Sequence, residues 1–252
     1  KPDYAEAYYN IGVLLENNGN PDAAIDNYMQ VLKIIPNHAG AYNNIGNTQK
    51  GMGDFEAAIN SYNRAVLIKP DYAEAYYNLG LAQHDKGDLN AAIDSYNSAL
   101  KIKPEYSEAF NNIGNALKGK GELEAAIGYY KQALKIKPDY ANAHYNMGNA
   151  LKDKGKLEAA INSYKQALKI KPNYIEAYSN MGVALKDSGL LEAAIDCYQR
   201  VLKIKPNYAE AYYNMGIALL EKGDLEAAME SYKRAIKIEP KHADAHINKA
   251  FL

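Results

Sequence analysis

The sequence has no tryptophan, only three phenylalanines and a single cysteine, Cys197. One cysteine excludes an internal disulfide framework. Because no histidine is close to Cys197 in the sequence, we do not expect it to be a catalytic nucleophile. Phosphate-binding glycine loops and carboxylate pairs are also lacking, and the pair His242 and His246 alone is weak evidence for a metal. We therefore expect no enzymatic activity, no cofactor and no metal.

An excess of one charge sign is also lacking. There are 29 Lys and Arg residues against 30 Asp and Glu residues, which gives a net charge of −1. Such a balance provides no general attraction to nucleic acid or to anionic membranes. No apolar run is long enough to span a bilayer, and no signal-peptide pattern is present. We therefore expect no nucleic-acid or membrane partner and a cytoplasmic location.

Proline is present at a strict interval. It recurs every 34 residues, at Pro2, Pro36, Pro70, Pro104, Pro138, Pro172, Pro206 and Pro240. A unit of this size is too small to hold a core of its own, so the units must stack as a solenoid. We expect a single array with repeats at 5–38, 39–72, 73–106, 107–140, 141–174, 175–208 and 209–242, and a partial repeat at 243–252. The chain starts at Lys1 without Met and ends within a helix, so we expect it to be part of a longer protein.

Each repeat contains two helical patterns and no strand. In residues 107–140, apolar residues spaced three to four apart predict one helix from 107 to about 120 and a second from 122 to 137. Gly121 is expected to end the first helix and Pro138 the second. Asp71 with Glu74, and Asn173 with Glu176, predict capping boxes at the starts of first helices. The expected fold is therefore all-α, with seven helical hairpins and part of an eighth.

A glycine inside every first helix predicts close packing. Glycine in a helix interior costs about 1 kcal/mol relative to alanine, so its repetition indicates a neighbour too close for a β-carbon. The glycines are Gly12, Gly46, Gly80, Gly114, Gly148, Gly182 and Gly216. Small residues on the second helix, Ala126 in the repeat 107–140 and its equivalents, are the expected partners, and a recurrent tyrosine, Tyr130 in that repeat, is expected in the core.

These positions resemble the tetratricopeptide repeat (TPR) family. In the third repeat the pattern reads Tyr76, Leu79, Gly80, Gln83, Ala92, Tyr96, Ala99 and Pro104. The resemblance covers the whole chain, although Gln83 stands where the family has Leu. It implies an α-α superhelix whose first helices line a concave groove. It also implies binding of peptides or proteins without catalysis.

One position on the first helix is always asparagine: Asn10, Asn44, Asn78, Asn112, Asn146, Asn180, Asn214 and Asn248. We call these residues the asparagine ladder. A carboxamide both donates and accepts hydrogen bonds, so it can bind a peptide group whatever the side chain. Repeats of this style resemble those of O-linked N-acetylglucosamine transferases, whose TPR superhelix carries such a ladder. The alternative is that each asparagine bonds to a neighbouring helix and fixes the repeat geometry, and both roles are compatible.

Next to the ladder, the sequence alternates between aromatic and amide side chains over most repeats. The preceding residue is Tyr9, Asn43, Tyr77, Asn111, Tyr145, Ser179 and Tyr213 in turn, and one turn later Asn47, Asn115 and Asn149 interrupt aliphatic residues. We hypothesise that the four tyrosines receive apolar side chains of a ligand and that the three asparagines belong to the same site. The alternative is that the chain arose by duplication of repeat pairs.

Three functions are compatible with this pattern. The first is a scaffold that binds an extended peptide or flexible protein segment through the ladder. The second is the substrate-recognition module of a larger transferase-type enzyme, of which no catalytic domain lies within these residues. The third is a structural protein that assembles head-to-tail, because the helix expected at 243–252 lacks a partner and leaves apolar surface open.

Overall fold

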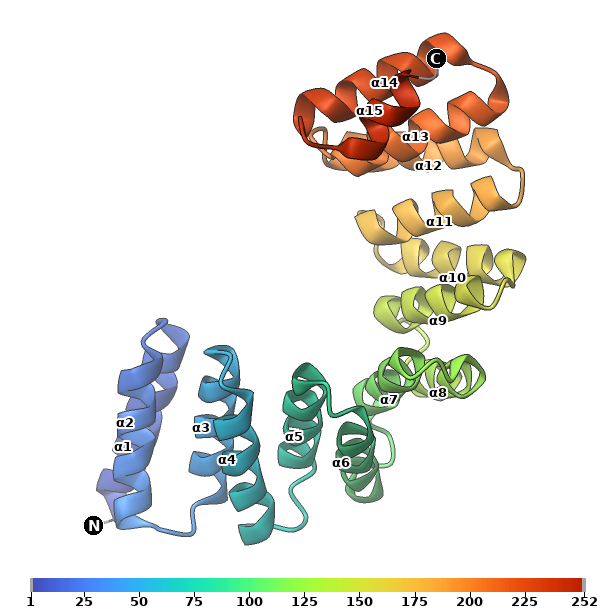
Figure 1. Cartoon of the computed structure of the whole chain (residues 1–252). Helices are drawn as coiled ribbons and strands as arrows, with labels where there is room; N and C mark the ends of the chain where they lie inside the picture. Colours follow the sequence, from blue (N-terminus) through green and yellow to red (C-terminus); the bar gives the residue numbers. More distant parts are fainter. Residues whose placement is uncertain (1, 251–252) are drawn as a thin grey trace. The chain divides into compact units, whose positions relative to one another are not determined.

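The computed structural model describes residues 2–250 and the side chains of residues 4–249. Over this range the backbone forms fifteen α-helices and no strand, which confirms the predicted all-α helical-repeat fold (Figure 1). The helices are α1 (Pro2–Asn17), α2 (Pro21–Ile34), α3 (Ala39–Gly51), α4 (Phe55–Ile68), α5 (Ala73–Lys86), α6 (Leu89–Ile102), α7 (Ser107–Gly119), α8 (Leu123–Ile136), α9 (Ala141–Asp153), α10 (Leu157–Ile170), α11 (Ile175–Asp187), α12 (Leu191–Ile204), α13 (Ala209–Lys222), α14 (Leu225–Ile238) and α15 (Ala243–Ala250).

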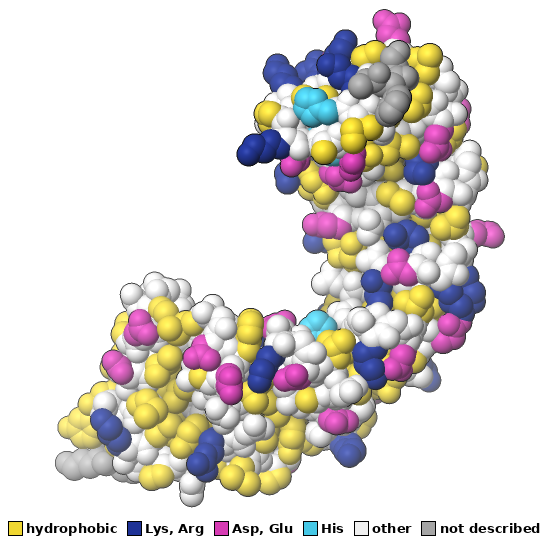
Figure 2. Space-filling model, in the orientation of Figure 1, with side chains coloured by type: hydrophobic (Ala, Val, Ile, Leu, Met, Phe, Trp, Pro, Cys, Tyr) yellow, Lys and Arg dark blue, Asp and Glu magenta, His cyan; other side chains and the backbone are white. Residues whose placement is uncertain are grey.

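The helices belong to two compact units, residues 1–136 (unit 1) and residues 137–252 (unit 2). In each unit, consecutive helices pack in pairs, α1 on α2, α3 on α4 and so on. The second helix of a pair also packs on the first helix of the next pair, as α4 does on α5 and α12 on α13. On the visible surface, acidic and basic side chains are interspersed, as the balanced composition requires (Figure 2).

Glycine and proline set the lengths of the helices. The glycine that follows each first helix has a positive φ, +78° at Gly121, which a β-carbon would strain, so the helix ends there. The second helix α8 ends at Ile136, two residues before Pro138, as the sequence predicts. These two signals account for the similar length of nearly every hairpin.

The glycine inside each first helix packs against a tyrosine ring. A β-carbon built on Gly114 would lie 2.5 Å from Cε1 of Tyr130, a residue of α8 with no exposed surface. The same pairing occurs seven times: Gly12 with Tyr28, Gly46 with Tyr62, Gly80 with Tyr96, Gly114 with Tyr130, Gly148 with Tyr164, Gly182 with Tyr198 and Gly216 with Tyr232. Close packing is therefore confirmed, but the expectation of alanine partners was wrong. The flat ring needs the space that the missing β-carbon leaves.

The predicted capping boxes were also wrong. The first helices begin one residue later than the pattern suggested, so the N-cap residue is Tyr72 in the third repeat and Tyr174 in the sixth, and neither side chain makes a capping hydrogen bond. Where histidine replaces this tyrosine, the ring does cap the helix. Nδ1 of His38 accepts from the amide of Ala41 at 3.0 Å. The aromatic residue occupies the cap position because it also packs against a first-helix tyrosine, as Tyr174 does against Tyr145.

Candidate functional site

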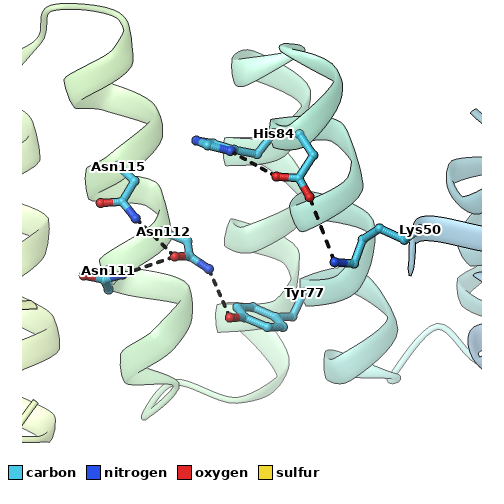
Figure 3. Close-up of polar contacts among 7 residues, drawn as sticks. Lys50, Tyr77, His84, Asn111, Asn112 and Asn115 are labelled. Carbon is cyan, nitrogen blue, oxygen red and sulfur yellow. Dashed lines mark hydrogen bonds and ion pairs between the residues drawn. The ribbon is translucent and has the colours of Figure 1, made fainter. Parts of the chain in front are cut away.

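Ladder asparagines bond backward to the preceding repeat. Nδ2 of Asn112 on α7 donates to the hydroxyl of Tyr77 on α5 at 3.0 Å (Figure 3). Asn44 donates in the same way to Tyr9 at 2.9 Å. In unit 2, Asn180 donates to Tyr145 at 3.0 Å. The asparagines thus tie neighbouring first helices together, as the alternative interpretation of the ladder anticipated.

Where the residue before the ladder is asparagine, it accepts the same bond. Nδ2 of Asn78 donates to Oδ1 of Asn43 at 3.1 Å. Asn43 is only 2% exposed, because its shorter side chain lies deeper between the helices than a tyrosine does. Ser179 is too short for this role: Asn214 instead bonds to Glu210 on its own helix at 3.2 Å, and the buried hydroxyl of Ser179 has no partner among the described residues.

The remaining ladder residues follow the same arrangement only in part. Asn10 on α1 is exposed. Asn146 is half-buried and interacts with its surroundings. Asn248 on α15 is half-buried. The ladder residues from Asn44 to Asn214 are therefore half-buried and held by interactions within the fold, whereas Asn10 is exposed.

The ladder keeps hydrogen-bonding capacity in reserve. An asparagine amide carries two donor hydrogens and a carbonyl oxygen, and the bond from Asn78 to Asn43 uses one of those hydrogens. The carbonyl oxygen of Asn78 accepts no bond from the described residues, whereas that of Asn112 accepts from Asn111 at 3.2 Å and from Asn115 at 3.4 Å. A ladder amide whose carbonyl oxygen is unused, such as that of Asn78, can therefore bind a peptide group more readily than one whose carbonyl oxygen already accepts hydrogen bonds, such as that of Asn112.

The four tyrosines that precede the ladder are packed on both sides. The ring of Tyr77 lies 4.7 Å from that of Tyr106 and 5.8 Å from that of Tyr96. Tyr9, Tyr145 and Tyr213 have the same two kinds of neighbour. Burial raises the pKa of Tyr77. Each of the four rings is half-buried, so a ligand can contact only the part that these neighbours leave accessible. The recurrent aromatic at the end of each repeat was the sequence signal for this stacking.

Three asparagines of the proposed site serve the core. Oδ1 of Asn115 accepts from the buried hydroxyl of Tyr130 at 2.9 Å. Asn47 and Asn149 accept from Tyr62 at 2.7 Å and from Tyr164 at 2.8 Å. Where Leu81 or Val183 replaces the asparagine, the hydroxyl of the corresponding tyrosine, Tyr96 or Tyr198, has no partner in the described part of the chain. Asn47, Asn115 and Asn149 therefore have a structural role, whatever they contribute to binding.

Charged residues at the ends of the first helices largely neutralise one another. Nζ of Lys50 lies 3.9 Å from Asp85, which also approaches the ring of His84 at 3.8 Å (Figure 3). In unit 2, Lys186 pairs with Asp187 at 2.9 Å and with Glu221 at 3.5 Å. The hydrogen bond that Lys186 donates to Asp187 raises the pKa of Lys186 despite partial burial. The edge beside the ladder therefore carries little net charge.

Other kinds of site find little support in residues 2–250. No group of three or more His, Cys, Asp or Glu residues is placed to hold a metal ion in this range. No helix described is long and apolar enough to cross a membrane. Cys197 is buried, and burial raises the pKa of its thiol to about 12, so the thiol is protonated at neutral pH.

Comparisons with known proteins agree with the geometry. A tetratricopeptide repeat model matches residues 5–38 and 209–242, and a second TPR repeat model matches residues 52–87, 83–121, 114–154, 148–189 and 184–223. No curated protein is similar enough to count as a relative.

Several solved structures share the fold. The chain is similar to MamA, with 30% identity and a TM-score of 0.60 over 64% of this chain and 95% of that one. It is similar to YrrB, described as a TPR protein with an unusual peptide-binding site, with 24% identity and a TM-score of 0.65 over 76% of this chain and 99% of that one. Part of a TPR protein from Cytophaga hutchinsonii gives a TM-score of 0.74 at 18% identity, over 94% and 97% of the two chains.

Proposed function

This chain belongs to the tetratricopeptide repeat family, and on that premise we propose that it is a non-enzymatic scaffold that binds an extended peptide or flexible protein segment along its asparagine ladder. The observation that carries the proposal is the spare hydrogen-bonding capacity of half-exposed ladder amides whose orientation is already fixed. Asn78 is the clearest case, since one amide hydrogen is used and its carbonyl oxygen is not. An amide held in place loses little conformational entropy when a ligand binds.

The spacing of the ladder favours recognition of a main chain. Neighbouring helices lie about 8–10 Å apart, and an extended chain advances about 3.3 Å per residue. One ladder asparagine would therefore meet about every third residue of the ligand, and the amide contact does not depend on the side chain at that residue. Of the related structures, YrrB is described as having a peptide-binding site. That description adds support for peptide binding but does not locate a site here.

The first experiment distinguishes a binding role of one ladder residue, Asn112, from its role in the fold. Asn112→Ala removes the ladder amide together with its hydrogen bonds to Tyr77, Asn111 and Asn115, whereas Tyr77→Phe removes only the hydrogen bond between Asn112 and Tyr77. Peptides selected from an array by the wild-type chain are titrated against both variants. We expect the alanine variant to bind these peptides about threefold to tenfold more weakly, and the phenylalanine variant to bind almost as the wild type does. Equal weakening by both substitutions would mean that Asn112 acts only through the fold.

The second experiment tests main-chain recognition directly. Each residue of a selected peptide is replaced in turn by its N-methyl form, and in a parallel series by alanine. We expect N-methylation to weaken binding at intervals of about three residues, and alanine substitution to matter less. A peptide whose affinity depends on its side chains alone contradicts the ladder proposal.

Other parts of the proposal follow from the sequence. The chain is proposed to act without catalysis and in the cytoplasm, with a protein or peptide as its partner. The ladder residues are the proposed binding residues. Tyr9, Tyr77, Tyr145 and Tyr213 contribute the accessible parts of their rings, and Asn47, Asn115 and Asn149 contribute amide hydrogens that are not used within the fold.

Self-association is a second candidate, favoured by the outer face of α1. Ile11 is 45% exposed, whereas the equivalent Ile45 and Ile113 are 4% and 0% exposed because the preceding repeat covers them. Leu14, 62% exposed, lies on the same helix. We propose that the C-terminal end of a second copy covers this face. Sedimentation velocity should then show a mass that rises with concentration and falls back in the Ile11→Lys variant; a constant monomer mass contradicts this candidate.

A further inference from the structure

The second helix of the second repeat differs from the others on its exposed side. Leu67 on α4 is 70% exposed, the highest value among the large apolar side chains described as exposed. Its equivalents in the other complete repeats are all lysine: Lys33, Lys101, Lys135, Lys169, Lys203 and Lys237. Seen from the side shown in Figure 2, hydrophobic side chains are numerous over the N-terminal part of unit 1. Leu67 is thus an apolar side chain at a position where each of the other complete repeats has a charged one.

Leu67 lines a cavity on this side of the repeat. The cavity has a volume of about 420 Å³ and is lined by Pro36, Asn37, Tyr42, Arg64, Leu67 and Ile68. We call this set the outer recess. A second cavity of about 490 Å³ shares Tyr42, Arg64 and Leu67 and continues along α4.

The outer recess is separate from the ladder. Tyr42 and the ladder residue Asn44 are both on α3, two positions apart. Two positions correspond to a rotation of about 200° around a helix. The two side chains therefore point to nearly opposite sides of α3, and a ligand in the recess does not compete with one on the ladder.

The recess carries an unpaired positive charge. Within the described residues, the guanidinium of Arg64 has no ion pair and no hydrogen bond, and no acidic residue lines either cavity. In unit 2, an equivalent cavity of about 470 Å³ is lined by Pro206, Asn207, Tyr212, Arg234, Lys237 and Ile238. There Arg234 pairs with Glu230 at 3.0 Å, and lysine replaces the leucine. The cavity around Arg234 thus has the same frame, but there the guanidinium is paired and lysine stands in place of the leucine.

We propose that the outer recess is a second peptide-docking site, which takes a segment presenting a carboxylate beside an apolar side chain. The carboxylate pairs with Arg64, whose planar guanidinium can donate two parallel hydrogen bonds. The apolar side chain covers Leu67 and the ring of Tyr42. Charge complementarity selects this occupant, since the lining supplies a cation and amide or hydroxyl groups but no anion.

The test uses two blocked tetrapeptides, acetyl-Gly-Leu-Glu-Gly-amide and its Gln counterpart. They are titrated into the full chain with labelled leucine methyl groups, and the Leu67 signal is assigned from its loss in Leu67→Lys. We expect a saturable shift of this signal, with a dissociation constant of about 1 mM or weaker. The Glu peptide should bind up to about fivefold more tightly than the Gln peptide, as for a largely exposed ion pair.

Matched variants make the test specific. Arg64→Gln and Leu67→Lys introduce the residues that the fourth repeat has at these positions, Gln132 and Lys135, so they preserve the fold. We expect Arg64→Gln to abolish the preference for Glu. Leu67→Lys serves only to assign the signal, because it removes the methyl groups that are observed. Arg234→Gln, in the equivalent cavity of unit 2, should leave the Leu67 shift unchanged.

Three results would overturn the proposal. They are equal affinity of the wild-type chain for the two peptides, an effect of Arg234→Gln as large as that of Arg64→Gln, and the absence of a saturable shift at Leu67. Asn112→Ala serves as a further control. Because it alters only the ladder, it should leave this titration unchanged, so failure of the ladder proposal and failure of this one are distinguishable.

Discussion

The hydroxyl of Tyr130 donates a 2.9 Å hydrogen bond to Oδ1 of Asn115, on the neighbouring first helix of its own repeat. Tyr96 lies in the same place in the preceding repeat, is equally buried, and has no such partner because Leu81 replaces the asparagine. The two core tyrosines therefore differ in this hydrogen bond. This pair makes the contribution of that bond measurable within a single protein.

Tyr130→Phe should lower the free energy of unfolding by about 1 kcal/mol, because the bond to Asn115 is lost without a change in packing. Tyr96→Phe should leave stability unchanged or raise it slightly, since its buried hydroxyl is desolvated without compensation. Chemical denaturation of both variants provides the comparison. If the two substitutions cost the same, the hydrogen bond to Asn115 contributes nothing.

Gly114→Ala should lower the free energy of unfolding by about 1–3 kcal/mol, because its β-carbon would lie 2.5 Å from the ring of Tyr130 and force the ring to move. Gly128 in the neighbouring helix α8 is the matched control. A β-carbon there would meet no atom within 4 Å, so Gly128→Ala should raise stability by about 0.5–1 kcal/mol. Thermal melting distinguishes the two outcomes, and destabilisation by both substitutions would argue against the steric explanation.

The bond from Asn112 to Tyr77 should appear as a coupling between repeats. In a double-mutant cycle of Asn112→Ala and Tyr77→Phe, we expect the two effects on unfolding to be non-additive by about 0.5–1.5 kcal/mol. Phenylalanine keeps the ring contacts of Tyr77, so the cycle isolates the hydroxyl. Simple additivity would show that the two side chains do not support each other.

Stability should fall at alkaline pH. Burial raises the pKa of the core tyrosines Tyr62, Tyr96 and Tyr164, and it raises that of Tyr174 to about 12. A tyrosine in the unfolded chain ionises near pH 10. Above that pH the unfolded state loses protons that the folded state retains, so each such tyrosine decreases stability by up to about 1.4 kcal/mol per pH unit.

Denaturation midpoints measured from pH 8 to pH 11.5 check this expectation. They should be level below about pH 10 and fall above it. The midpoint of the Tyr96→Phe variant should fall less steeply with pH than that of the wild type, because one titrating group is removed. A midpoint that stays level across this range would show that the core tyrosines do not titrate differently in the folded and unfolded chains.

The sequence predicted the all-α architecture and most of the helix ends. The helix ends could be predicted because residues such as Gly121 and Pro138 end a helix through their own backbone conformations, which do not depend on distant contacts. Gly114 was recognised as a close contact for the same reason. Its partner was misassigned because the choice between Ala126 and Tyr130 depends on how two helices face each other, which periodicity alone does not determine.

The candidate site was less predictable. The repetition of Asn112 and its equivalents was evident, but the direction of its amide toward Tyr77 depends on the distance between helices of different repeats. The capping error at Tyr72 has a related cause, since the motif around Asp71 and Glu74 is local, whereas the aromatic residue is placed by contacts with the neighbouring repeat. The outer recess could not be predicted from the sequence, because the exposure of Leu67 and the lack of a partner for Arg64 depend on the folded chain.

The backward bond of the ladder has a consequence for the growth of such chains. The donor is a ladder amide at Asn44, Asn78, Asn112 and Asn180, and the acceptor is either a phenol such as that of Tyr77 or the carboxamide of Asn43. The preceding repeat therefore need not have one particular residue as the acceptor. A gene for such a protein can therefore gain or lose whole repeats while the hydrogen bond between neighbouring repeats is kept. The bond is lost where the preceding repeat has a side chain as short as that of Ser179.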